Sequence, residues 1–187
     1  MKDTLIEAAK VLREGGVILY PTDTVWGLGC DATNPKAISR IFGIKRRDEA
    51  KSLVVLAADL DMIARHVREI PEMAIQLVEV NDAPMTIIYP DAVGLAPNAV
   101  AEDGSVGIRI PLSDDCVDLC RSLGRPVIST SANVSGEPSP KTFADIPEEI
   151  KAAVDYIVDP SLEKGGTGKA SQIIKVGLDG QIKIIRA

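Results

Sequence analysis

The sequence has little histidine and few aromatic residues, and each scarcity excludes a kind of site. His66 is the only histidine among 187 residues, so sites that need two or three histidines are excluded. Aromatic residues make up 3% of the chain, as two Phe, three Tyr and one Trp. This scarcity speaks against a surface that binds RNA by stacking bases on aromatic rings.

Cysteines and long apolar runs are also sparse. Cys30, Cys116 and Cys120 form an odd set, and the last two have a spacing that suits one helix face better than a zinc site. We therefore expect buried thiols in a reducing compartment. No apolar run approaches the roughly 20 residues of a membrane span, and the first residues lack the apolar stretch of a signal peptide. A soluble, cytoplasmic protein with no membrane partner is predicted.

The rest of the composition is that of an ordinary globular protein. Apolar residues make up 45% and charged residues 26% of the chain, which excludes global disorder. The length predicts a single domain over residues 1–187. With 27 acidic and 21 basic residues, the formal net charge is −6. A general coat for nucleic acid is therefore not expected, whereas a local basic patch is compatible with this charge.

Apolar periodicity predicts helices and strands that alternate along the chain. Helices are expected to begin at Thr4, with Glu7 completing a capping box, and at Asn34. Further expected helices cover 59–67, 71–80, 113–123 and 145–153, and expected strands cover 17–20, 53–57, 85–89, 105–110, 126–129, 157–158, 172–176 and 181–185. Segments 21–29 and 131–140 are expected to be loops, and the last two strands to form a hairpin. This order predicts an α/β fold in which helices pack on a mixed sheet.

A basic cluster surrounds the second expected helix. Segment 36–51 has six basic and two acidic residues, a local net charge of +4 that leaves −10 on the rest of the chain. The basic residues are Lys36, Arg40, Lys45, Arg46, Arg47 and Lys51. Such a local field is expected for a ligand that carries phosphate. The alternative is a solvated helix end whose cations offset the helix dipole.

Two segments that follow strands carry small polar residues. Segment 129–136, Ser-Thr-Ser-Ala-Asn-Val-Ser-Gly, offers hydroxyls and a glycine that let backbone N–H groups approach a phosphate or carboxylate. Its alternative interpretation is an ordinary turn. Segment 21–29, Pro-Thr-Asp-Thr-Val-Trp-Gly-Leu-Gly, contains Trp26, which in the alternative interpretation only fills the core. Arg109 lies in an alternating strand and needs an anion if it is buried, either a ligand or a structural carboxylate.

Standard catalytic motifs are missing. Segment 165–169, Gly-Gly-Thr-Gly-Lys, is similar to a phosphate-binding loop, but Glu163 stands where that motif needs glycine and Ala170 where it needs Ser or Thr. We therefore expect a flexible loop there. The sequence offers no Ser–His–acid arrangement and no paired carboxylates for a metal. Chemistry would depend on positioning and on cations that oppose phosphate charge.

Four of these segments, taken in order, resemble the motifs of the YrdC-like family, the threonylcarbamoyl-adenylate synthases, in its short single-domain form. Segment 21–29 resembles the opening motif, 45–47 (Lys-Arg-Arg) the lysine-x-arginine motif, 106–111 the arginine strand and 131–133 (Ser-Ala-Asn) the Ser-x-Asn motif. The resemblance covers essentially the whole chain. It implies a twisted α/β sheet whose concave face forms a positively charged cleft.

The resemblance also implies an activity and a set of site residues. The activity is a nucleotidyl transfer in which L-threonine, bicarbonate and ATP give threonylcarbamoyl-AMP and pyrophosphate, for modification of an adenosine in tRNA. Lys45 and Arg47 are the implied catalytic cations, and the Arg109 guanidinium suits the threonine carboxylate. The implied threonine-binding residues are Thr24, Arg109, Ser129 and Ser171. The implied ATP-binding residues are Arg47, Lys51, Ser105, Ser131, Asn133, Ser139 and Arg186.

Several further expectations accompany this interpretation. No protein metal site is expected, and Mg²⁺ would be held by the nucleotide phosphates. Lys45 is expected to face solvent in the cleft, so that Lys45→Ala slows turnover without unfolding the protein. Downstream tRNA-modifying proteins are expected partners. Two alternatives remain: an RNA-binding module that holds tRNA or double-stranded RNA in the same cleft, for example in ribosome maturation, and a nucleotide-binding paralogue without turnover.

Overall fold

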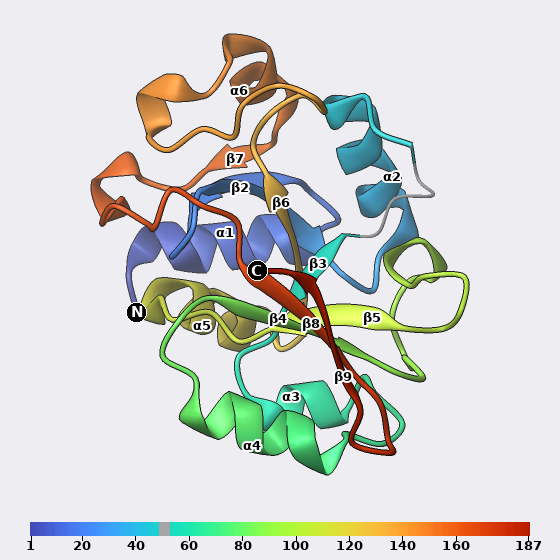
Figure 1. Ribbon diagram of the computed structural model, residues 1–187. Coiled ribbons are helices and arrows are strands. Elements are labelled where there is room, and N and C mark those ends of the chain that lie inside the picture. The colour runs from blue at the N-terminus through green and yellow to red at the C-terminus, as the bar shows by residue number, and fades with distance from the viewer. Residues whose placement is uncertain (49–52) are drawn as a thin grey trace.

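The computed structural model describes residues 1–48 and 53–187 (Figure 1). Its helices are α1 (Asp3–Arg13), α2 (Pro35–Lys45), α3 (Leu60–Ala64), α4 (Glu72–Val80), α5 (Asp114–Leu123) and α6 (Glu148–Ala153). Its strands are β1 (Ile18–Pro21), β2 (Trp26–Asp31), β3 (Val54–Leu56), β4 (Met85–Tyr89), β5 (Val106–Arg109), β6 (Val127–Ser131), β7 (Tyr156–Ile157), β8 (Gln172–Val176) and β9 (Ile182–Arg186). Short 3₁₀ turns cover Pro97–Ala99, Phe143–Asp145 and Pro160–Leu162.

The strands form one mixed sheet in the order β7-β1-β2-β6-β3-β5-β4-β8-β9. The pairs β1/β7, β3/β5 and β4/β8 are parallel, and the remaining neighbours are antiparallel. Helices flank the sheet, and Figure 1 shows α1 and α5 behind the strands. This architecture confirms the predicted α/β class. Among the described residues, no helix is long and apolar enough to cross a membrane.

Helix α1 shows how the apolar pattern becomes a packed face. Its stripe of buried residues packs on α5 and on β2. The predicted capping box at its start is wrong. The N-cap is Lys2 and makes no side-chain cap, because Thr4 lies inside the first turn. There its hydroxyl shares a hydrogen bond of 2.9 Å with Tyr156 and accepts one of 3.0 Å from the Asp159 amide, which ties α1 to the β7 edge.

The prediction of a loop throughout segment 21–29 is wrong, because β2 begins at Trp26. Its glycines weaken the strand pattern, but pairing with β1 on one side and β6 on the other holds the segment extended. Gly29 is needed for packing, since a Cβ there would lie 2.7 Å from the ring of Tyr20. Trp26 is buried, as its alternative interpretation required. Strand β2 therefore supports β6, whose hydroxyl-bearing residues lie beside its glycines.

Helix α5 carries two of the three cysteines on its buried face. Cys116 and Cys120 are buried, and both thiols are free. Burial raises the pKa of the Cys116 thiol to about 12, so the thiolate is not formed near neutral pH. The prediction of buried thiols on one helix face is confirmed. The hairpin of β8 and β9 is also confirmed, with antiparallel pairing from Val176 and Ile182 onward.

Candidate active site

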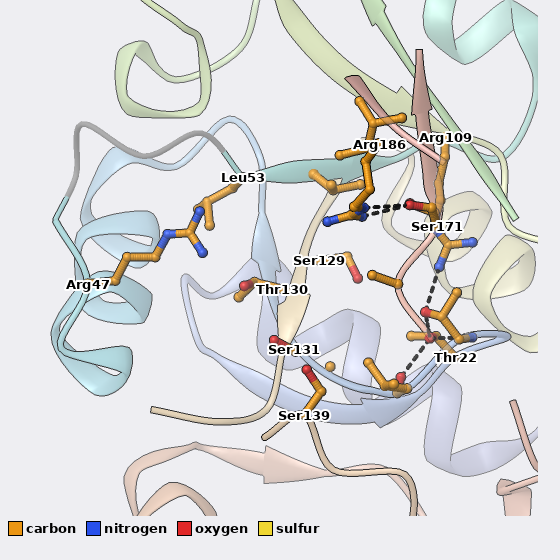
Figure 2. Close-up of a pocket in the computed structure, with 16 residues that line it drawn as sticks. Thr22, Arg47, Leu53, Arg109, Ser129, Thr130, Ser131, Ser139, Ser171 and Arg186 are labelled. Atoms are coloured by element: carbon orange, nitrogen blue, oxygen red, sulfur yellow. Dashed lines mark hydrogen bonds between the residues drawn. The ribbon is translucent and has the colours of Figure 1, made fainter. Parts of the chain in front are cut away.

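A cavity of about 340 Å³ lies at the centre of the sheet, lined from β2, β3, β5, β6, β8 and β9 and from their loops. Figure 2 shows Arg47 on one side of it, Arg109 and Arg186 on the other, and the hydroxyls of Ser129 and Ser131 between them. Of the predicted site residues that the structure describes, eight line this cavity: Thr24, Arg47, Arg109, Ser129, Ser131, Ser139, Ser171 and Arg186. Segments far apart in the sequence thus meet around one space, as the cleft hypothesis requires.

Arg109 ends β5 and is 4% exposed. Its Nη1 donates to both carboxylate oxygens of Asp23, at 2.7 and 2.8 Å, and its Nη2 makes a longer contact of 3.4 Å with Thr24 Oγ1. The carboxylate of Asp23 also accepts from the Leu112 amide at 3.0 Å. The anion that buried Arg109 needs is therefore a structural carboxylate. Because Nη1 donates to Asp23 and Nη2 makes only one long contact, Nη2 is the nitrogen of this pair that can donate to a ligand in the cavity.

The orientation of Thr24 follows from its neighbours. The Thr22 hydroxyl donates to the Val25 carbonyl at 2.6 Å. Since a hydroxyl has one proton, the 2.9 Å contact between the hydroxyls of Thr22 and Thr24 has Thr24 as its donor. Thr24 Oγ1 then accepts from Arg109. Thr22, Thr24, Arg109 and Asp23 therefore form a connected set of hydrogen bonds at this end of the cavity.

Ser171 and Arg186 form the wall next to Arg109. The Arg186 guanidinium donates through Nε and Nη2 to the carbonyl oxygen of Ser171, at 3.0 and 2.7 Å. The Ser171 hydroxyl shares a 2.7 Å hydrogen bond with Thr86 on β4. Burial lowers the pKa of Arg186. Arg186, which was predicted to bind ATP, and Ser171, which was predicted to bind threonine, are therefore in direct contact.

Lys45 does not face solvent, so this part of the prediction is wrong. The side chain is 1% exposed, and Nζ donates to the carbonyl oxygens of Ser131 and Asn133, the latter at 2.8 Å. The Lys45 carbonyl in turn accepts from the Ser135 amide at 2.9 Å. Burial and the positive charge of Arg47 lower the pKa of Lys45 to about 8. Lys45 therefore ties α2 to the loop after β6 and does not line the cavity.

The turn at the end of α2 separates the members of the basic cluster. Arg46 is the C-cap and adopts a left-handed conformation, with φ 51° and ψ 45°. Lys45 then points inward, Arg46 is exposed and pairs with Glu149 at 3.1 Å, and Arg47 reaches the cavity. Arg40 pairs with Asp155. The five cations of the cluster that the structure describes do not form one phosphate-facing patch, because only Arg47 among them lines the cavity.

Three predicted ATP-binding residues are not among the described residues that line the cavity. Asn133 is buried, and its amide donates to the carbonyls of Val134 and Glu137 at 3.1 and 2.8 Å, so it orders its own loop. Ser105 precedes β5, at the end opposite Arg109, and its hydroxyl donates to Asp103. Neither lines the cavity. Lys51 lies outside the described residues.

Sequence reasoning missed Asp23 as a site residue although it stands in a noted motif. It also missed Thr22 and Thr130, which line the cavity. The continuous run of hydroxyl-bearing residues at the end of β6 was a usable signal for Thr130. For Asp23 there was none, since its partner Arg109 lies 86 residues away and the two meet only through the strand order.

The charged residues of the cavity bear on metal binding. None of the described residues that line it is acidic, while three are arginines. Nor do the described parts of the chain contain a group of three or more His, Cys, Asp or Glu side chains that could hold a metal ion. These donors suit anionic ligands, such as a carboxylate or a polyphosphate, and the hydroxyls between them add neutral hydrogen bonds.

Comparisons with known proteins give a consistent result. The family model Sua5_yciO_yrdC, described as "Telomere recombination", matches residues 10–187, which include every residue that lines the cavity. A protein of Idiomarina loihiensis described as threonylcarbamoyl-AMP synthase is 31% identical over 177 residues, which are 93% of this chain and 94% of that relative. A protein of Stenotrophomonas maltophilia with the same description is 34% identical over 173 residues, or 91% and 92% of the two chains.

A solved structure has the same fold. The crystal structure of P. abyssi Sua5 complexed with L-threonine matches with a TM-score of 0.83 and 30% sequence identity. The match covers 92% of this chain and 50% of that chain, so this chain spans about half the length of that Sua5 protein.

Proposed function

Since the chain belongs to the Sua5/YciO/YrdC family, we propose that it is an L-threonylcarbamoyladenylate synthase. The proposed reaction converts L-threonine, bicarbonate and ATP to threonylcarbamoyl-AMP and pyrophosphate. The observation that carries the proposal is the cavity itself: arginines stand on both sides of it, and serine and threonine hydroxyls lie between them (Figure 2). Two anionic ligands can therefore be held next to each other in one space.

Threonine is assigned to the end formed by Arg109. Nη2 of this guanidinium would meet the carboxylate of the amino acid, while Asp23 keeps the side chain in place. Hydroxyls of Thr24, Ser129 and Ser171 surround the same end. This arrangement suits a small amino acid whose own hydroxyl can donate and accept hydrogen bonds.

The nucleotide is assigned to the side of Arg47, with Ser131 and Ser139, and it would reach Arg186 on the opposite wall. The threonine amine attacks the carbon of bicarbonate, a C–N bond forms, and water leaves to give a carbamate. A carbamate oxygen then attacks the α-phosphorus, a new P–O bond forms, and the bond to pyrophosphate breaks. Negative charge grows on the phosphate oxygens, and Arg47 would stabilise it.

Lys45 enters the proposal as a residue that acts through others. Its ammonium fixes the carbonyl oxygens of Ser131 and Asn133, so it holds the loop that brings Ser131 to the nucleotide. The charge of Lys45 adds to the potential at the phosphates without direct contact. Lys45, which the resemblance implies to be a catalytic cation, therefore has an indirect role in this proposal.

Magnesium is proposed to arrive with the nucleotide. No described lining residue offers a carboxylate to a resident metal ion, and Mg²⁺ commonly binds through substrate phosphates and water. Nucleotidyl transfer is the reaction class that this scheme implies. We also keep as predictions the single domain over residues 1–187, the cytoplasmic location, and the downstream tRNA-modifying partners.

The test of the proposed function is pyrophosphate release. The purified protein with ATP and Mg²⁺ should release pyrophosphate only when L-threonine and bicarbonate are both added, and serine should replace threonine poorly. Release without threonine, or none under any of these conditions, contradicts the proposal. Absence of turnover together with RNA binding that falls steeply with salt would favour an RNA-binding module instead. ATP binding that ignores threonine would favour a nucleotide-binding paralogue.

A further inference from the structure

The glycine-rich loop 165–168 lies directly against the segment that carries Asp23 and Thr24. The Thr167 amide donates to the Asp23 carbonyl and the Gly168 amide to the Thr24 carbonyl, both at 3.0 Å. A Cβ at Gly166 would lie 2.3 Å from the Thr24 carbonyl oxygen and 2.8 Å from its carbonyl carbon. Because these are backbone atoms, no side chain fits at position 166 unless the segment moves.

The loop is anchored on both sides of these contacts. Before it, one carboxylate oxygen of Glu163 accepts from the Trp26 indole and, at 2.7 Å, from the Phe143 amide. After it, Ser171 is buried and bonded to Thr86 at 2.7 Å. The loop is therefore held in place from outside and is a fixed partner for the segment it touches, in contrast to the flexible loop that the sequence predicted.

The segment needs such a partner because space lies on two sides of it. Thr22 lines the central cavity and also a second cavity of about 480 Å³, whose lining includes Asp23 and residues of the glycine-rich loop. Packing alone therefore leaves the segment only partly enclosed. The two backbone hydrogen bonds from the loop fix the carbonyls of Asp23 and Thr24 and, with them, the position of both side chains.

Both side chains are partners of Arg109, through Nη1 for Asp23 and Nη2 for Thr24. We propose that the glycine-rich loop is a positioning element for the amino-acid end of the cavity, and that Gly166 is its positioning residue. This inference rests on the proposed function, since it takes the ligand at Arg109 to be threonine. The loop therefore affects the binding of threonine through Thr24 and Arg109, and it does not contact the nucleotide.

The experiment is a pair of calorimetric titrations, with L-threonine and with a non-hydrolysable ATP analogue, on the full chain. Gly166→Ala should raise the Kd for threonine on the order of tenfold or more, because small displacements of binding groups have large effects. The Kd for the ATP analogue should change less than about twofold. The matched control is Gly43→Ala, since a Cβ at Gly43 meets nothing within 4 Å; both Kd values should stay as in the wild type.

A second variant decides the matter if Gly166→Ala does not fold. Glu163→Ala removes an anchor of the loop without adding an atom against Thr24, and it should raise the Kd for threonine alone. Unchanged threonine binding in a folded Gly166→Ala protein, or equal losses of threonine and ATP analogue, overturns the positioning role and leaves the proposed function standing. A wild type that binds the analogue but no threonine would instead overturn the proposed function.

Discussion

Arg109 and Lys45 are both buried cations beside one cavity, yet different groups hold them. Arg109 faces the carboxylate of Asp23, whereas Lys45 donates to the carbonyl oxygens of Ser131 and Asn133. Carbonyl dipoles replace the lost hydration of an ammonium only in part, so burial lowers the pKa of Lys45 to about 8. A guanidinium remains charged at any working pH. The charge of Arg109 is therefore permanent, whereas the charge of Lys45 titrates.

The largest expected effect breaks the Arg109 end. Arg109→Ala should raise the Kd for threonine roughly 100-fold, because a charge-assisted hydrogen bond to the carboxylate is lost. The Kd for an ATP analogue should change only a few-fold. The variant should also unfold more easily, by about 3 kcal/mol, since the mostly buried carboxylate of Asp23 loses its cation. Titration calorimetry and urea denaturation measure these effects.

The matched control is Arg125→Ala. Arg125 pairs with the buried carboxylate of Asp31 at 2.6 Å, and neither residue lines the cavity. This variant should lose stability yet bind threonine as the wild type does. If it loses threonine binding to the same degree as Arg109→Ala, the effect at Arg109 reflects stability and not contact with the ligand.

The next largest effect is expected when the buried contacts of Lys45 are removed. Lys45→Met should lower the free energy of unfolding by about 2 kcal/mol, because the carbonyls of Ser131 and Asn133 lose their donor. Binding of the ATP analogue should weaken more than binding of threonine. Urea denaturation and calorimetry check both. Unchanged stability would return Lys45 to the role of a solvent-facing lysine, which its burial argues against.

The sequence predicts those features of the fold and of the site that are determined by neighbouring residues, and it misses those that depend on distant contacts. Strands β4 and β8 match their expected ranges residue for residue, because alternating or continuous apolar runs fix them. The inward direction of Lys45 depends on the left-handed turn at Arg46, which no periodicity reports. The partner of Arg109 depends on strand order, and β2 on burial between two neighbours that outweighs its glycines. Such long-range causes are outside the reach of local patterns.

A pH titration sharpens the comparison with a smaller effect. The pKa of Lys45 is about 8 in the folded protein and 10.5 in its ordinary state. Between these values the unfolded chain keeps a proton that the folded chain has lost, so the free energy of unfolding should rise with pH. From pH 7 to pH 9, the wild type should gain about 1 kcal/mol relative to Lys45→Met. If the free energy of unfolding changes with pH by the same amount in the wild type and in Lys45→Met, the lowered pKa of Lys45 is contradicted.

The smallest effect concerns Arg46, the exposed cation between Lys45 and Arg47 in the sequence. Arg46 pairs with Glu149 at the surface, and Arg46→Asn keeps a residue that tolerates its left-handed backbone. The free energy of unfolding should change by less than about 0.5 kcal/mol, and both ligands should bind as in the wild type. A marked loss of ATP binding would show that the basic cluster acts as a whole and not through Arg47 alone.

The most direct measurement of the central claim compares two conservative variants in the same calorimeter. Arg109→Lys and Arg47→Lys each keep the charge and lose the guanidinium fork. We expect Arg109→Lys to weaken the binding of threonine and to leave the binding of the ATP analogue unchanged. We expect the opposite pattern for Arg47→Lys. A cavity with two separate anion-binding ends would be contradicted if each variant weakened the binding of both ligands equally. It would also be contradicted if the wild type bound neither ligand.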